Sequence, residues 1–295
     1  EEFSPGKANW RRRTKVPTIL INTTSLNSGH NYHFTAKFMG EPPGLTGFEV
    51  DMNARYRRMY YDDLEKSSFR NFSVGKAVAA SACVPGLFEP IELNHLYPGH
   101  ELKLVDGGVH DNQGVAGLLD EDCQILLCSD ACGQMGDQVN PKTGRLGVLL
   151  RSNSMLQDRI REAEYQELKS RVDAGSLYGL FFIHLKKDLR RDPIDWVDCQ
   201  DKTMPPDRGT QTPYHIDREI QGYLADLRTD LDSFTEVEAY ALMLSGYEMT
   251  RYQFEQLALD EQEKTGLQNA GNEWKGFPVD APTGDWPFLP LRDVI

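Results

Sequence analysis

The 295-residue sequence lacks any apolar run approaching the roughly 18–20 residues that a helix needs to cross a bilayer, so we expect no transmembrane helix. It also has little positive charge. Its 32 lysines and arginines stand against 45 aspartates and glutamates, for a net charge of −13. Because nucleic-acid binding requires clustered cations that neutralise phosphates, we expect no general binding to nucleic acid.

Cysteine is scarce and odd in number. The five residues do not have the spacing of a small disulfide scaffold, and none forms a Cys-x-x-Cys pair of the kind that holds a structural metal. We therefore expect reduced thiols packed in or beside core strands rather than a metal site. The five are Cys83, Cys123, Cys128, Cys132 and Cys199.

Basic residues gather in two short clusters. One comprises residues 11–13 with Lys15, and the other comprises Arg55, Arg57 and Arg58. Charge runs of this kind are more often solvated surface than ligand sites. Solvated surface is the favoured interpretation of both clusters, and a lipid-headgroup site remains the alternative.

Short, continuous apolar runs predict buried strands over residues 18–21, 124–128 and 180–185. Runs without alternation are typical of strands covered on both faces, as in a parallel sheet. Apolar positions alternate with polar ones over residues 32–38, which predicts a half-buried strand, and residues 27–29 before it resemble a hairpin turn.

Two helices are expected. Ser73 is a plausible N-cap for a helix through Ala82, whose alanines would allow another element to approach closely, and Ser81 is interpreted as part of that close packing. Residues 155–172 carry spaced apolar positions that predict an amphipathic helix. Farther on, Thr235-Glu-Val-Glu238 fits a capping box at the start of a further helix.

A catalytic carboxylate is predicted at Asp106. The run Leu102–Val105 predicts a buried strand that ends on Asp106, and Gly107 and Gly108 follow at once. An ionisable group at the end of a strand, before a tight turn, is where open α/β sheets place their ligand sites. The alternative is that Asp-Gly-Gly is simply a turn.

Neighbouring motifs favour the catalytic interpretation. Residues 80–90 read Ala-Ser-Ala-Cys-Val-Pro-Gly-Leu-Phe-Glu-Pro, residues 17–29 begin Pro-Thr-Ile-Leu-Ile-Asn-Thr-Thr, and Asp-Gly-Gly follows at residues 106–108. In this order they resemble the patatin-like phospholipases, over roughly residues 16–127. The resemblance implies a three-layer α/β/α fold with a mostly parallel central sheet.

The same resemblance implies hydrolysis of a phospholipid or other fatty-acyl ester by a Ser-Asp dyad, without a cofactor, at a transient membrane surface. It makes Asp106 the dyad aspartate. We expect the protein to be cytoplasmic or peripheral to a membrane. The family's serine lies in Gly-x-Ser-x-Gly, which this sequence does not contain.

We therefore expect an incomplete patatin-like domain over residues 17–260, the C-terminal part of a longer enzyme and inactive alone. Residues 1–16 are then a linker or a truncated edge, and residues 261–295 a tail rich in Pro, Gly and Trp. Such a fragment is expected to expose apolar surface. The alternative is a non-catalytic lipid- or partner-binding module. A third possibility is metal-assisted hydrolysis at Asp106 and Asp130.

Other residues near the predicted site have more than one possible role. His110 and Asp111 could orient Asp106 or cap the next helix, and capping is favoured. Asn112 could hold the loop by hydrogen bonds. Asp130, which also ends a strand before a glycine, is the rival carboxylate. His184 is expected to be a paired core histidine, and the loop over residues 192–213 a flexible cover near the site.

Overall fold

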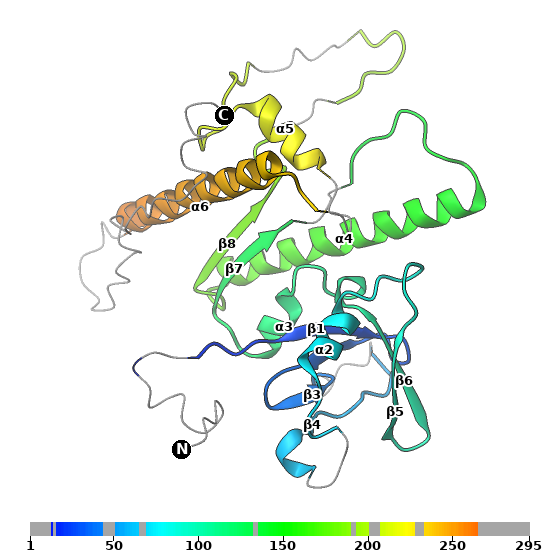
Figure 1. The fold of residues 1–295 in the computed structure, drawn as a ribbon. Coiled ribbons are helices and arrows are strands. Elements are labelled where there is room, and N and C mark those ends of the chain that lie inside the picture. Colours follow the sequence, from blue (N-terminus) through cyan, green and yellow to red (C-terminus); the bar gives the residue numbers. More distant parts are fainter. Residues whose placement is uncertain are drawn as a thin grey trace. The chain divides into compact units, whose positions relative to one another are not determined.

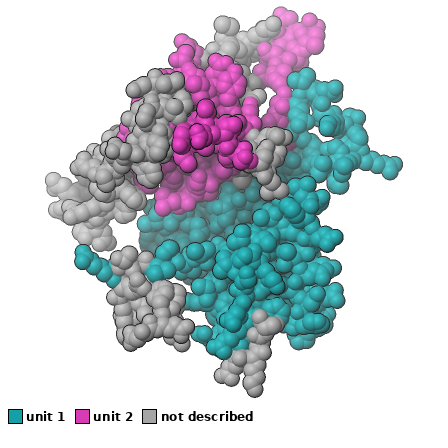
Figure 2. All heavy atoms as spheres, viewed as in Figure 1, with its two compact units in different colours: residues 1–126, 138–180 teal, residues 127–137, 181–295 magenta. Residues whose placement is uncertain are grey.

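The structure, a computed structural model, describes residues 13, 16–43, 51–64, 69–131, 135–189, 193–200, 207–227 and 233–264, with side chains up to residue 256. Its contacts divide the chain into two units (Figure 2). Unit 1 comprises residues 1–126 and 138–180, and unit 2 comprises residues 127–137 and 181–295. The predicted linker and tail lie almost entirely outside the described residues.

Unit 1 contains a six-stranded sheet with the order β4-β3-β2-β1-β6-β5 (Figure 1). Every pair of neighbouring strands in it is antiparallel. The expectation of a mostly parallel central sheet is therefore wrong. The strands are β1 (Ile21–Ser25), β2 (Asn31–Phe34), β3 (Phe38–Gly40), β4 (Met59–Tyr60), β5 (Ile91–Tyr97) and β6 (His100–Asp106).

Short connections explain the antiparallel pairing of β1 with β2 and of β5 with β6. Strands β1 and β2 are joined by a tight turn, as predicted at residues 27–29, and β5 and β6 by a two-residue turn at residues 98–99. Turns of this length can join only antiparallel neighbours, because a parallel pair needs a crossover of a dozen residues or more. A buried apolar run such as Leu102–Val105 does not by itself distinguish the two arrangements.

The strand predicted over residues 32–38 is two strands, β2 and β3, separated by a turn at Thr35–Lys37. All four residues of β2 are buried, so the expected half-buried alternation is wrong. Strand β1 begins at Ile21, where the predicted strand of residues 18–21 ends.

Helix α2 (Val74–Ser81) begins after Ser73, as predicted, although the Ser73 side chain makes no capping hydrogen bond. It buries Ala77 and Ala80 and packs against β1 and β6, which confirms the close packing. The core of unit 1 is formed by this helix and the sheet: Tyr32, Phe34, Met39, Tyr56, Ala77, Ala80, Leu93, Leu102 and Leu104.

Helix α4 (Arg145–Asp173) is longer than the predicted helix of residues 155–172. Its expected apolar face is not covered, since Leu156 is 65 % exposed and Leu168 is the buried residue of the helix. The amphipathic interpretation is therefore wrong for this helix.

Strands β7 (Ile125–Asp130) and β8 (Gly179–His184) form a separate two-stranded parallel sheet, at the places where strands were predicted. Burial alternates along β7, and Ile125 and Leu127 are exposed, so the expected cover on both faces is absent from this strand. Unit 2 also contains helices α5 (Arg218–Asp226) and α6 (Glu236–Lys264).

The predicted capping box starts α6. The Thr235 N–H donates to Glu238 at 2.7 Å, and the Glu238 N–H donates back to the Thr235 hydroxyl at 3.3 Å. Helix α6 contributes to the core of unit 2 together with β8, formed by Phe181, Ile183, Tyr214, Ile216, Leu244 and Met249.

Within the described ranges, no helix has both the length and the apolar character needed to cross a membrane. Cys83, Cys123, Cys128 and Cys199 form no disulfide within the described residues, and Cys132 lies outside them. The loop over residues 192–213 is described only in part, and its role as a cover stays a prediction.

Candidate active site around Asp106

Asp106 is the last residue of β6, as predicted, and pairs in register with Thr23 of β1. Its Oδ1 accepts the N–H of Gly108 at 2.7 Å and so caps a single 3-10 turn, η3 (Gly107–Val109). Its Oδ2 has no hydrogen-bond partner among the residues that the structure describes. The carboxylate is thus fixed through one oxygen and open at the other.

Both glycines after Asp106 lie in close contact with other atoms. A Cβ at residue 107 would lie 2.5 Å from the backbone oxygen of Asn22, and a Cβ at residue 108 would lie 2.5 Å from Oδ1 of Asn112. Real Cβ atoms do not approach other atoms so closely. Position 107 therefore has no room for a side chain, because the crowding atom is backbone, whereas at position 108 the side chain of Asn112 would have to move. Asp-Gly-Gly does form a turn, as the alternative interpretation holds. This turn also determines the position of the Asp106 carboxylate.

The backbone of Asp106 is held from two sides. Its N–H donates to the carbonyl of Cys83, just beyond the end of α2, at 2.9 Å, and its carbonyl accepts the Thr24 hydroxyl at 2.9 Å. The Cys83 thiol lies close enough to be affected by this carboxylate: burial raises the pKa of Cys83, and the Asp106 charge raises it further. Asp106 is therefore positioned by β1, β6 and α2 together.

Asp111 has the capping role that the sequence favours. It is 2 % exposed, and its carboxylate accepts the N–H groups of Val115 at 2.9 Å and Gly117 at 3.3 Å. These N–H groups belong to the first turn of helix α3 (Val115–Asp120). The side chain of Asn31 adds a contact at 3.4 Å, which ties this helix to β2.

His110 is half-buried, and its Nδ1 has no hydrogen-bond partner in the described part of the chain. Burial lowers its pKa, Asp111 opposes this shift, and His30 and Arg55 add to it. The pKa of His110 is therefore affected by a second group of charged residues, which lie in the turn before β2 and in the segment after β3. Asn112, by contrast, stays beside Gly108 and Asp106.

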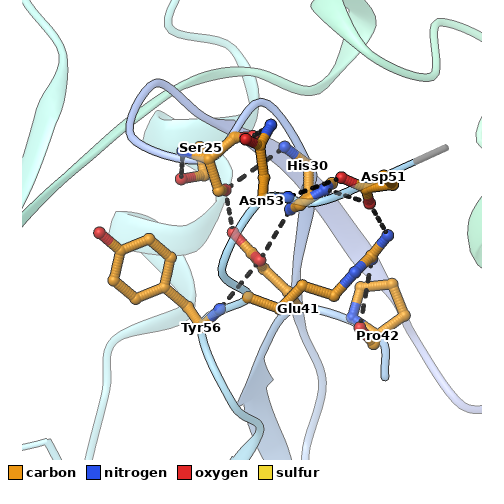
Figure 3. Close-up of polar contacts among 9 residues, drawn as sticks. Ser25, His30, Glu41, Pro42, Asp51, Asn53 and Tyr56 are labelled. Carbon is orange, nitrogen blue, oxygen red and sulfur yellow. Dashed lines mark hydrogen bonds and ion pairs between the residues drawn. The ribbon is translucent and has the colours of Figure 1, made fainter. Parts of the chain in front are cut away.

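That second group is a hydrogen-bonded network that the sequence did not reveal (Figure 3). Its centre is Glu41, which is 1 % exposed and directly follows β3. The Glu41 carboxylate accepts the Ser28 hydroxyl, contacts Nδ1 of His30 at 3.1 Å and accepts the Tyr56 N–H at 2.9 Å. Nε2 of His30 contacts Asp51 at 2.8 Å.

Asp51 also pairs with Arg55 at 2.6 Å, so the network runs from a serine hydroxyl to an arginine. It joins the β1–β2 turn to the segment before β4. Positions 28, 30, 41, 51 and 55 have no fixed spacing that would indicate a site. A signal that could have directed attention there is the placement of serine and histidine in a predicted hairpin turn.

The rival carboxylate Asp130 lies in unit 2, at the end of β7, and is 3 % exposed. With His184, at the end of β8, it lines a largely apolar pocket of about 370 Å³. Both residues have interactions within the described part of the chain. His184 is half-buried rather than enclosed in the core.

Within the described residues, no group of three or more His, Cys, Asp or Glu side chains is arranged to hold a metal ion. In a comparison with protein families, residues 5–119 match the family model described as Patatin-like phospholipase. A search of curated proteins gives no significant match. A search of solved structures gives none either.

Proposed function

We propose that the protein hydrolyses fatty-acyl esters with Asp106 as general base, because residues 5–119 match the Patatin-like phospholipase family model. The observation that supports this role is the state of the Asp106 carboxylate. One oxygen is fixed by the Gly108 N–H at 2.7 Å, and the other has no partner in the described residues. An oriented carboxylate with an open oxygen can accept a proton from a nearby hydroxyl.

The reaction follows from that role. Asp106 takes the proton of a serine hydroxyl while the serine oxygen attacks the acyl carbon of the ester. When the tetrahedral intermediate collapses, the bond to the leaving oxygen breaks and Asp106 returns the proton to it. Water then repeats the sequence at the acyl-serine and releases the fatty acid. No cofactor enters these steps.

The serine in this proposal lies in a Gly-x-Ser-x-Gly segment outside the 295 residues, because these residues do not contain that pattern. The chain then supplies half of the dyad and is inactive by itself. The substrate is a phospholipid or a related fatty-acyl ester, met during transient attachment to a membrane surface from the cytoplasm. The missing pattern also supports a second candidate, a lipid- or partner-binding module without catalysis.

The test uses the protein encoded with its upstream segment, assayed on a phospholipid and on a soluble fatty-acyl ester. Asp106→Asn preserves the acceptor for the Gly108 N–H but removes the base, so hydrolysis should fall by about 100-fold or more. The matched control is Asp130→Asn, the same change at the other strand-end carboxylate, which should keep most of the activity.

Ser28→Ala tests whether a serine within the chain acts as the nucleophile, because the Ser28 hydroxyl contacts the buried carboxylate of Glu41. We expect this variant to remain active. Activity that survives Asp106→Asn, or disappears with Ser28→Ala in a folded protein, would contradict the proposal. A reading frame without a serine elbow upstream would favour the binding module.

A further inference from the structure

A surface pocket of about 450 Å³ lies at the opposite end of β6 from Asp106. Its walls come from the β1–β2 turn at Asn27, from the segment of residues 53–57 and from the β5–β6 turn next to His100. This volume falls within the range of small-ligand sites in proteins. Asp106 is six residues farther along β6, or roughly 20 Å at the usual strand rise.

The charge of this pocket is unlike that of the whole chain. The sequence has 45 acidic and 32 basic residues. None of the residues lining the pocket is acidic, whereas Arg55, Arg57 and His100 all contribute to it. A local excess of cationic groups in an anionic protein creates a site that attracts small anions.

Arg55 and Arg57 differ in their pairing. Arg55 is already engaged by Asp51 at 2.6 Å. The guanidinium of Arg57 has no hydrogen bond or ion pair with any residue that the structure describes. An unpaired arginine beside neutral amide donors can bind an anion without first breaking an internal ion pair.

The walls are held in place before any ligand arrives. Asn27 donates to the Glu101 carbonyl at 3.0 Å and accepts the Lys103 N–H at 2.9 Å. Nδ1 of His100 contacts the Tyr56 hydroxyl at 3.1 Å. The Tyr97 hydroxyl donates to the carbonyl of Arg57 at 3.0 Å and so fixes the backbone that carries the free guanidinium.

We propose that this pocket binds a phosphate group, with Arg57 as the principal contact and His100 and Asn53 as additional donors. Arginine matches phosphate because its planar fork can donate two parallel hydrogen bonds. A free phosphate ester and a phospholipid headgroup present the same chemistry. The inference does not depend on the role of Asp106, since it rests on other residues.

In the experiment, the 295-residue chain is titrated with glycerol 3-phosphate at low ionic strength, and isothermal titration calorimetry measures the binding. Saturable binding is expected. Arg57→Gln should weaken it by about tenfold, and Arg57→Lys should restore part of the loss because it keeps the charge without the fork. The matched control is Arg159→Gln on α4, an exposed arginine paired with Glu162, which should bind like the unchanged protein.

A second arm measures sedimentation with vesicles of phosphatidylcholine, with and without phosphatidic acid. Binding to phosphatidic acid vesicles that is lost in Arg57→Gln assigns the pocket to a lipid headgroup. Binding to glycerol 3-phosphate without vesicle binding assigns it to a soluble ester. Binding to neither, or equal loss in Arg57→Gln and Arg159→Gln, would overturn the proposal. Circular dichroism of each variant confirms that it is folded.

Discussion

The backbone oxygen of Asn22 lies 2.5 Å from the point where a Cβ on Gly107 would stand. Asn22 belongs to β1 and Gly107 directly follows β6, so this contact brings the two strands together beside Asp106. Because the crowding atom belongs to the backbone, it cannot rotate away as a side chain would. The position of the candidate general base thus depends on the absence of a single carbon atom.

Gly107→Ala should therefore destabilise the protein by about 1–3 kcal/mol, the usual cost of overpacking. Denaturant unfolding measures this directly. The matched control is Gly222→Ala in α5, where nothing lies within 4 Å of the added carbon. That change should be neutral or stabilising, because alanine favours a helix. Equal stabilities of the two variants would show that the contact with Asn22 does not constrain the turn.

Asp111→Ala should cost about 2 kcal/mol, because the N–H groups of Val115 and Gly117 lose their acceptor in a buried setting. Asp111→Asn keeps one acceptor oxygen and should cost less. Unfolding of both variants gives the comparison. A loss as large for asparagine as for alanine would mean that the negative charge matters more than the capping geometry.

Glu41→Gln should destabilise the protein by about 3 kcal/mol, since it removes the buried charge that Ser28, His30 and Tyr56 share. Glu101→Gln provides the control at an exposed position, where surface substitutions usually change stability by less than about 0.5 kcal/mol. The measurement is the free energy of unfolding of each variant. Similar values for both would show that the network is not a stabilising element.

His33 makes stability depend on pH. It is fully buried on β2, neither ring nitrogen has a hydrogen-bond partner among the described residues, and burial, with Arg58 and His110 nearby, lowers its pKa to about 4. The unfolded chain takes up this proton near pH 6.5 and the folded chain only near pH 4. The folded state should therefore lose up to roughly 3 kcal/mol as the pH falls through this window.

His33→Leu should remove most of that loss and flatten the stability profile between pH 6.5 and about 4. Part of the slope should remain, because burial also lowers the pKa of His110. His95→Asn, at an exposed position of β5 whose positive φ asparagine tolerates, should leave the profile unchanged. An unchanged slope in His33→Leu would contradict the assignment.

Local features of the site were predictable from the sequence because they depend on neighbouring residues. The strand before Asp106, the turn after it, the capping by Asp111 and the start of α2 at Ser73 all follow from short patterns. Three ordered motifs also sufficed to indicate the patatin-like phospholipase family, which the match over residues 5–119 supports.

Sheet direction and long-range contacts were not predictable in the same way. A buried run such as Leu102–Val105 is apolar whether its neighbours are parallel or antiparallel, and the expected parallel sheet was wrong for that reason. The network around Glu41 assembles residues from a turn and two later segments, and no local pattern connects them. The spaced apolar residues of α4 predict an amphipathic helix, yet most of them are exposed.

The sparse burial of helix α4 determines how quickly its amide hydrogens exchange with solvent. Its 29 residues span about 44 Å, and Leu168, near the C-terminal end, is the residue that anchors it by burial. Elsewhere the helix relies on its own backbone and on side-chain pairs such as Arg159 with Glu162, each worth only a few tenths of a kcal/mol. Amide hydrogens should therefore exchange with solvent in a gradient, fastest near Arg145 and slowest around Leu168.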